Sequence, residues 1–113
     1  MKQISLKDLD FDKGSGLIPI VVQDMNTKEV LTLAYANKEA LELTLGTGLA
    51  HFYRRSHDKV MMKGETSGNI QKVSKILSDC DVDAIIYIVE PSGPACHEGT
   101  YSCFHCILYS SEQ

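Results

Sequence analysis

The sequence contains no apolar run that approaches the roughly 20 residues needed to cross a bilayer. Its first residues, Met1 to Ser5, lack the apolar core of a secretory signal peptide. It also lacks an excess of basic residues, because 11 Lys and Arg stand against 15 Asp and Glu, for a net charge of −4. Proteins that bind nucleic acid usually carry a broad basic surface. These absences predict a cytoplasmic protein that binds neither membranes nor nucleic acid.

Internal repeats, low-complexity tracts and linkers are also absent, and a chain of 113 residues suffices for one domain. We therefore expect residues 1–113 to form a single domain around one core. Leu6, Leu9 and Phe11 are expected to dock the polar N-terminal segment onto that core. In a reducing compartment, the four cysteines are more typical of metal ligands or free thiols than of disulfides.

The pattern of apolar and turn residues predicts a compact α+β domain, with a mostly antiparallel β-sheet or a partly open barrel and one short helix. The expected strands cover residues 17–23, 29–36, 49–55, 60–63, 70–78 and 82–90. The apolar spacing of residues 70–78 also suits a helix, but the β-branched side chains favour a strand. Asn37 is typical of a helix N-cap. The helix is expected from about Lys38 to Leu45, with Gly46 and Gly48 ending it.

Three acidic residues alternate with other side chains in Asp79-Cys80-Asp81-Val82-Asp83. If Asp79 to Val89 forms one regular strand, the aspartates share one face and Cys80 points to the other. Carboxylates this close repel one another unless a cation lies between them, and Mg²⁺ prefers oxygen ligands. The stretch therefore predicts either a magnesium site or a solvated acidic strand end.

Cys80, Cys96 and Cys103 lie too far apart in sequence for the close ligand pairs of a zinc finger. Three thiolates would suit a zinc ion that keeps an open position for water, and three ordinary buried thiols are the alternative. Cys103 and Cys106 also form a C-x-x-C, which would suit a redox pair or half of a structural zinc site. No second such pair exists, and no strand-to-helix pattern surrounds this one. Alternatively, Cys106 belongs to the core in a closing strand from His105 to Tyr109.

Residues 51–63 carry four cations against the single acid Asp58, namely Arg54, Arg55, Lys59 and Lys63. The loop that follows places Glu65, Thr66 and Ser67 between two glycines. Such a loop can direct amides and hydroxyls at phosphate oxygens, although it lacks the Walker pattern. The segment predicts an anion site, with a solvated charged hairpin as the alternative.

Several short blocks of the chain form a more specific pattern, in this order: Gly16-Leu17-Ile18-Pro19, Val22-Gln23-Asp24, Leu33-Ala34-Tyr35, Asn37-Lys38-Glu39-Ala40-Leu41, Tyr53-Arg54-Arg55-Ser56, Lys63-Gly64-Glu65-Thr66-Ser67-Gly68, Asp79-Cys80-Asp81-Val82-Asp83-Ala84, and Pro94-Ala95-Cys96-His97-Glu98-Gly99 with Ser102-Cys103-Phe104. In these blocks the chain resembles the phosphoribosyl-AMP cyclohydrolase family of histidine biosynthesis, nearly from end to end. The last three blocks are the most specific.

The resemblance implies a hydrolase that opens the purine ring of N1-(5-phosphoribosyl)-AMP between N1 and C6, giving the formimino-aminoimidazole carboxamide ribonucleotide. It implies a homodimer with active sites at the subunit interface, zinc ligands from both chains, and Mg²⁺ as a second metal. The implied zinc ligands are Cys80, Cys96 and Cys103, and the implied magnesium ligands are Asp79, Asp81 and Asp83. His97 is expected to activate water or protonate the departing nitrogen, or else only to orient the zinc loop.

The substrate has two phosphate groups, for which Arg54, Arg55 and Lys63 are the expected cations, helped by Thr66 and Ser67, with Glu65 in the same loop. Mg²⁺ is expected either to bind a phosphate or to organise the zinc loop. Family members often carry Trp and His where this chain has Met61 and Asn69.

Two competing functions remain open at the level of sequence. A zinc nucleotide deaminase also attacks C6 of adenine, but its H-x-E and P-C-x-x-C signature is absent. A module without enzymatic activity would instead use Cys80, Cys96, Cys103 and Cys106 as a structural zinc site.

Overall fold

The computed structural model describes residues 2–112 of the chain. The elements are the 3-10 turns η1 (Leu6–Asp8) and η2 (Asp12–Gly14), the helix α1 (Lys38–Thr47), and the strands β1 (Ile18–Asp24), β2 (Val30–Ala36), β3 (His51–Arg54), β4 (Lys59–Met62), β5 (Gln71–Ser78) and β6 (Ile85–Pro91). The six expected strands and the helix are therefore present, with bounds that differ by one to three residues at most ends.

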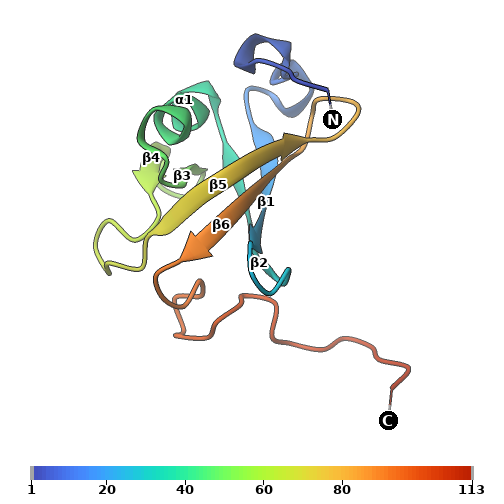
Figure 1. Ribbon diagram of the computed structural model, residues 1–113, viewed down its shortest axis with the longest axis vertical. Helices are drawn as coiled ribbons and strands as arrows, with labels where there is room; N and C mark the ends of the chain where they lie inside the picture. The colour runs from blue at the N-terminus through green and yellow to red at the C-terminus, as the bar shows by residue number, and fades with distance from the viewer. Residues whose placement is uncertain (1, 113) are drawn as a thin grey trace.

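Four of the strands form one open sheet in the order β2-β1-β6-β5, and β3 and β4 form a separate hairpin. The pairs β1–β2, β5–β6 and β3–β4 are antiparallel, whereas β1 and β6 run parallel with Ile20 opposite Ile85. Parallel neighbours need a long crossover connection, which the helix and the hairpin provide here (Figure 1). The predicted α+β class with mostly antiparallel sheet is confirmed, and the sheet is open rather than closed into a barrel.

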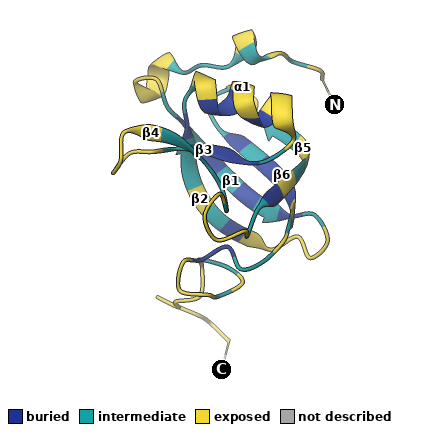
Figure 2. Ribbon diagram, turned by 90° about the vertical axis from the view of Figure 1, so that its left-hand side faces the viewer, coloured by how far each residue is buried: buried dark blue, intermediate teal, exposed yellow. Residues whose placement is uncertain are grey.

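The core lies between one face of this sheet and the helix (Figure 2). Ile18, Ile20 and Val22 alternate along β1 and are fully buried, as the period of a strand requires. Tyr87 of β6 and Leu41 of α1 are buried against them. The N-terminal segment packs against this core through its three apolar side chains, as expected: Leu6, Leu9 and Phe11.

The helix begins where the sequence predicts. The Asn37 side chain accepts a 2.9 Å hydrogen bond from the amide of Ala40, which satisfies one free N–H of the first turn. The helix runs to Thr47, two residues beyond the predicted end, because Gly48 rather than Gly46 adopts the left-handed conformation that stops it. Among residues 2–112, no helix has the length and apolarity needed to cross a membrane.

The condition that Asp79 to Val89 is one regular strand is not met, and the strand predicted over residues 82–90 begins three residues later, because residues 79–84 form a loop and β6 begins at Ile85. The Asp79 carboxylate accepts hydrogen bonds from the amides of Asp83 (3.1 Å) and Ala84 (3.2 Å). Val82 lies at φ 55°, a left-handed conformation that a regular strand excludes. The side chain of Asp79 thus competes with strand pairing. The expected alternation, with the aspartates on one strand face and Cys80 on the other, therefore does not apply.

A closing strand from His105 to Tyr109 is not formed either, and Cys106 is exposed rather than part of the core. The segment leaves the body of the molecule (Figure 1). Ile107, Leu108 and Tyr109 are 83%, 102% and 82% exposed. These three apolar residues are typical of a strand, but within the described chain they have no neighbouring strand edge to pair with.

Candidate metal sites and substrate loop

The segment that follows β6 carries two of the candidate zinc ligands. It folds back on itself through backbone hydrogen bonds from Ala95 to Tyr101 (3.1 Å) and from Cys96 to Thr100 (3.2 Å). The amide of Cys103 then donates to the carbonyl of Leu31 on β2, at 2.7 Å. We call residues 95–103 the thiol loop. These bonds hold Cys96 and Cys103 on one short, closed loop against the sheet.

The environment of Cys96 favours its thiolate. A hydrogen bond from the Thr100 side chain is the largest cause, followed by the Glu98 backbone and the His105 side chain, and together they lower the pKa of Cys96 to about 7. The nearby Cys103 thiol acts in the same direction. Because metals bind the thiolate rather than the thiol, the loop offers a soft anionic donor at neutral pH.

Cys80, the third predicted thiolate, lies at the other end of β6. It is exposed in the loop between β5 and β6, whereas the thiol loop follows the end of β6 at Pro91 (Figure 1). The seven residues of β6 separate the two ends by about 20 Å at the rise of an extended strand. One chain therefore does not bring Cys80 together with Cys96 and Cys103.

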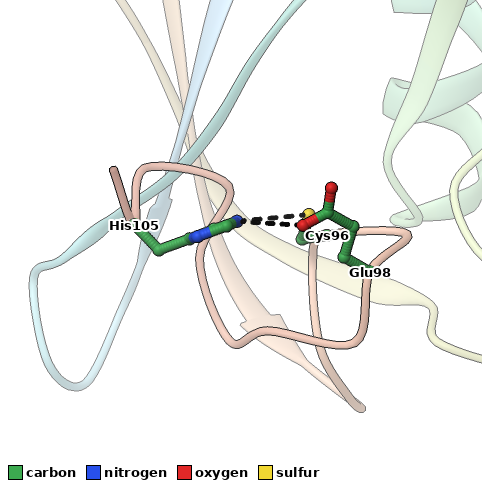
Figure 3. A group of neighbouring side chains, drawn as sticks. All are labelled: Cys96, Glu98 and His105. Atoms are coloured by element: carbon green, nitrogen blue, oxygen red, sulfur yellow. Dashed lines mark hydrogen bonds and ion pairs between the residues drawn. The ribbon is translucent and has the colours of Figure 1, made fainter. Parts of the chain in front are cut away.

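The donors that one chain does bring together are Cys96, Glu98 and His105 (Figure 3). One candidate ligand atom from each lies within 4.8 Å of the others. His105 Nε2 lies 3.9 Å from Cys96 Sγ and 3.7 Å from Glu98 Oε1. No metal-binding role is expected for Glu98 or His105 from the sequence alone. Their positions near Cys96 and Cys103 in the chain were the available signal, but spacing alone does not show which side chains converge.

The three aspartates that follow β5 lie close together even though they are not on a strand. Asp79, Asp81 and Asp83 each place a carboxylate oxygen within 4.8 Å of the others. Lys13, which sequence reasoning missed, contacts this group with Nζ 2.7 Å from Asp83 Oδ2. The Lys13 ammonium, followed by Asp79, holds the pKa of Asp83 below its usual value. Asp83 is therefore held as a carboxylate, and the cluster presents hard oxygen donors.

The predicted phosphate cations lie on and beside the β3–β4 hairpin. Arg54 and Arg55 are exposed, and the Arg55 guanidinium stacks 4.0 Å above the ring centre of Tyr35. Lys63 instead points toward the thiol loop, where its ammonium donates a 2.8 Å hydrogen bond to the carbonyl of Ala95. Residues 63–68 form the loop expected to bind substrate, which we call the substrate loop, and this contact links it to the loop of Cys96.

The turn after β4 packs closely against its neighbours, while its polar side chains remain outside. Glu65, Thr66 and Ser67 are exposed. Gly64 lies at φ 81°, and a Cβ there would overlap the backbone of Asn69. A Cβ on Gly93 would overlap the Asn69 side chain, so Asn69 fills the space between this turn and the segment leading to the thiol loop. Asn69, where family members often carry His, therefore contributes to packing in this chain.

His97 adjoins Cys96 at the surface of the thiol loop. It is exposed, and its side chain makes no hydrogen bond with any of residues 2–112. An imidazole in this setting is free to turn toward a molecule bound at the loop.

The fold and these donor groups define a small α+β protein with one thiol-bearing loop and one carboxylate-bearing loop, the donor sets of a soft and a hard metal ion. The family model described as phosphoribosyl-AMP cyclohydrolase matches residues 32–105. The phosphoribosyl-AMP cyclohydrolase of Cenarchaeum symbiosum is 61% identical over 100 residues, which cover 88% of this chain and 93% of that relative.

Two further relatives extend the comparison. The phosphoribosyl-AMP cyclohydrolase of Archaeoglobus fulgidus is 57% identical over 93% of this chain and 96% of its own length. The histidine biosynthesis bifunctional protein HisIE of Pyrococcus furiosus is 57% identical over 96% of this chain but only 51% of its own length. The chain belongs to the phosphoribosyl-AMP cyclohydrolase family.

Proposed function

We propose that this protein hydrolyses N1-(5-phosphoribosyl)-AMP by opening its purine ring between N1 and C6, a step of histidine biosynthesis. The observation that carries this proposal is the family match over residues 32–105, which spans the substrate loop, the aspartate cluster and the thiol loop. The high identity to relatives named for this activity supports it over most of the chain.

The donor chemistry fits a catalytic zinc ion held by Cys80, Cys96 and Cys103. The lowered pKa of Cys96 supplies a thiolate at neutral pH, and thiolates are the ligands that zinc prefers over magnesium. When bound with an open position, zinc lowers the pKa of a coordinated water toward neutrality. Mg²⁺ fits the oxygen donors of Asp79, Asp81 and Asp83.

The placement of the thiols supports a homodimer that shares its zinc ligands. Cys80 lies at one end of β6, and Cys96 and Cys103 lie beyond the other. Two copies in opposite orientation would bring the Cys80 end of each chain to the thiol loop of the other, which makes two equivalent sites in one symmetric dimer.

His97 is the proposed proton-transfer residue. A water molecule loses a proton to the imidazole as its oxygen bonds to C6. The second hydrogen of the water passes to the 6-imino nitrogen, so that the carboxamide forms as the C6–N1 bond breaks. The imidazolium returns its proton to N1, so one water is consumed and the histidine is regenerated. His97 adjoins Cys96 and is exposed, which leaves its ring accessible to a substrate at the thiol loop.

The two phosphate groups of the substrate are assigned to the basic residues of the hairpin. Arg54 and Arg55 are exposed there, and Lys63 joins the same region to the thiol loop through Ala95. Thr66, Ser67 and Glu65 line the adjoining turn as further polar contacts. A guanidinium can hold a phosphate through two hydrogen bonds. Mg²⁺ on the aspartates would bind a phosphate or order the loop between β5 and β6.

The first experiment follows ring opening by ultraviolet absorbance with purified protein, before and after zinc removal by a strong chelator, with Mg²⁺ supplied. We expect turnover to disappear with zinc and to return when zinc is added back. The matched control is Cys106→Ser, which removes an exposed thiol outside the proposed site and leaves turnover intact. No turnover by a folded, zinc-loaded protein would contradict the proposal and bring back the deaminase and structural-zinc alternatives.

The role of His97 has its own test. His97→Ala should keep its zinc content but lower kcat by about 10²–10⁴, the usual contribution of general acid–base catalysis. Full turnover with zinc retained would remove His97 from the mechanism.

A further inference from the structure

A second set of metal donors is assembled by a single chain on the thiol loop and the residue pair that follows it. Cys96 is 9% exposed and anchors the set, while the side chains of Glu98 and His105 are 61% and 35% exposed. Their ligand atoms face one another across a small space (Figure 3). An ion can therefore reach this space from solvent without unfolding the loop.

The distances in this group are close to those of a zinc site. In a tetrahedral zinc site, a sulfur and a nitrogen ligand lie about 3.5 Å apart, and a nitrogen and an oxygen ligand slightly closer. The separations here are 3.9 Å between Cys96 Sγ and His105 Nε2, and 3.7 Å between His105 Nε2 and Glu98 Oε1. For these two pairs, shifts of about 0.4 Å reach coordination distances, and the ligand atoms of Cys96 and Glu98 lie within 4.8 Å of each other.

The direction of the groups also favours a cation between them. His105 Nε2 faces two acceptors at once, the sulfur of Cys96 and a carboxylate oxygen of Glu98. A neutral imidazole nitrogen carries at most one proton and can donate it to only one of them. A cation that accepts an electron pair from all three groups satisfies the whole set, and a cysteine, a histidine and a carboxylate together suit zinc rather than magnesium.

The backbone around these residues is held before any ion binds. The loop is closed by the hydrogen bonds of Ala95 and Cys96 with Tyr101 and Thr100. Cys103, two residues before His105, is fixed to Leu31 on β2. The donors therefore lie on a constrained segment, which reduces the entropy that a metal would otherwise have to offset.

We infer that one chain binds Zn²⁺ through Cys96 and Glu98 of its thiol loop and through His105 just after that loop, without Cys80 from any second chain. This site takes the ion before the shared site forms, and His105 holds the position that the partner's thiolate later occupies. The inference rests on the proposed function only for the choice of zinc as the ion. It makes zinc acquisition a property of the single chain rather than of the assembled dimer.

The test measures zinc affinity rather than turnover, with Zn²⁺ alone as the probe and a chromophoric chelator as competitor. Cys80→Ser should still bind one zinc per chain. Cys80→Ser/His105→Ala should bind it at least about tenfold more weakly, since even supporting residues of zinc sites contribute that much. The matched control is Cys80→Ser/His57→Ala, because His57 is an exposed histidine in the turn of the hairpin and should leave affinity unchanged.

Glu98→Gln in the Cys80→Ser background provides a second variant in which folding is not at stake, since Glu98 is exposed. It should also weaken binding, and Co²⁺ in place of zinc should lose intensity in its visible bands as the site changes. If Cys80→Ser holds no zinc, or if His105→Ala leaves its affinity unchanged, the inference is wrong. A wild-type protein that binds zinc and turns over substrate in that case would leave the proposed function standing. Zinc binding by Cys80→Ser without any wild-type turnover would support the inference and contradict the proposed function.

Discussion

Tyr101 donates a 2.6 Å hydrogen bond from its hydroxyl to Oδ2 of Asp24, a residue 77 positions earlier in the chain. Asp24 is only 5% exposed, and its other carboxylate oxygen accepts from the amides of Asn26 and Thr27 in the β1–β2 turn. The thiol loop is thus attached to the end of β1 by a buried carboxylate. The position of Cys96 and Cys103 depends on this contact as well as on the backbone of the loop.

Tyr101→Phe should lower stability in a pH-dependent way. The hydrogen bond from Tyr101 is the largest cause that holds the pKa of Asp24 below its ordinary value of 3.8. A carboxyl group with a lowered folded-state pKa contributes stability that is present above the unfolded value and is lost as the pH falls through the folded value. Denaturant unfolding should therefore show a wild-type advantage at pH 7 that shrinks as the pH falls below 3.8.

The control for this measurement is Tyr109→Phe, which removes a hydroxyl that is 82% exposed. It should leave the unfolding midpoint unchanged at every pH. A difference between Tyr101→Phe and wild type that stays constant across the whole pH range would show that Asp24 is not the partner responsible.

Mixed dimers test the shared zinc site directly. Cys80→Ser and Cys96→Ser should each be inactive alone, but a mixed dimer contains one site with both defects and one with none. Random mixing of equal amounts should restore about one quarter of wild-type activity, since half of the dimers are mixed and half of their sites are intact.

The control pair is Cys96→Ser with Cys103→Ser, which both lie on the thiol loop. Every site in such a mixture lacks one thiolate, so activity should not return. Recovery in the control pair, or none in the first pair despite subunit exchange confirmed by mass spectrometry, would contradict a zinc site shared between chains.

Gln71 is a buried polar side chain without a hydrogen-bond partner among the described residues. It is 1% exposed, and neither atom of its amide group hydrogen-bonds to any of residues 2–112. An unsatisfied buried polar group destabilises a fold by about 1–3 kcal/mol, so Gln71→Met, which preserves its shape, should raise the free energy of unfolding by about 1 kcal/mol. Gln23→Met serves as the control. The Gln23 side-chain amide has a partner, because it donates a 2.8 Å hydrogen bond to the carbonyl of Lys28, so this substitution should not raise the free energy of unfolding. Denaturant titration that finds Gln71→Met less stable than wild type would mean that Gln71 has a polar partner.

Gly64 and Gly68 form a matched pair in the substrate loop, at φ 81° and 83°. Alanine at either position is strained by about 1–2 kcal/mol because of the left-handed backbone. Only at Gly64 would the added Cβ also overlap the backbone of Asn69, whereas the space around Gly68 is open. Gly64→Ala should therefore destabilise the protein by about 1–3 kcal/mol more than Gly68→Ala, as measured by thermal unfolding. Equal effects of the two substitutions would mean that the loop can move away from Asn69 and avoid the overlap.

The features that the sequence predicted well are those that depend on neighbours in the chain. The helix start at Asn37 depends on one hydrogen bond to Ala40, three residues away. The β1–β2 and β3–β4 pairs follow from alternation and short turns. The acidic stretch was the local failure, because the Asp79 side chain captures two backbone amides that a strand would have used for pairing.

The sequence by itself determined the chemistry of the donors: two thiols in one block, Cys80 among three carboxylates in another, and cations followed by a glycine-bracketed turn ahead of both. Only the tertiary structure decided which of them meet. The extended strand β6 sets Cys80 at the opposite end of the sheet from Cys96, while Glu98 and His105 converge on Cys96. The sequence specifies each side chain directly. Contacts between distant segments depend on the order and packing of the strands, which the spacing of residues alone does not encode.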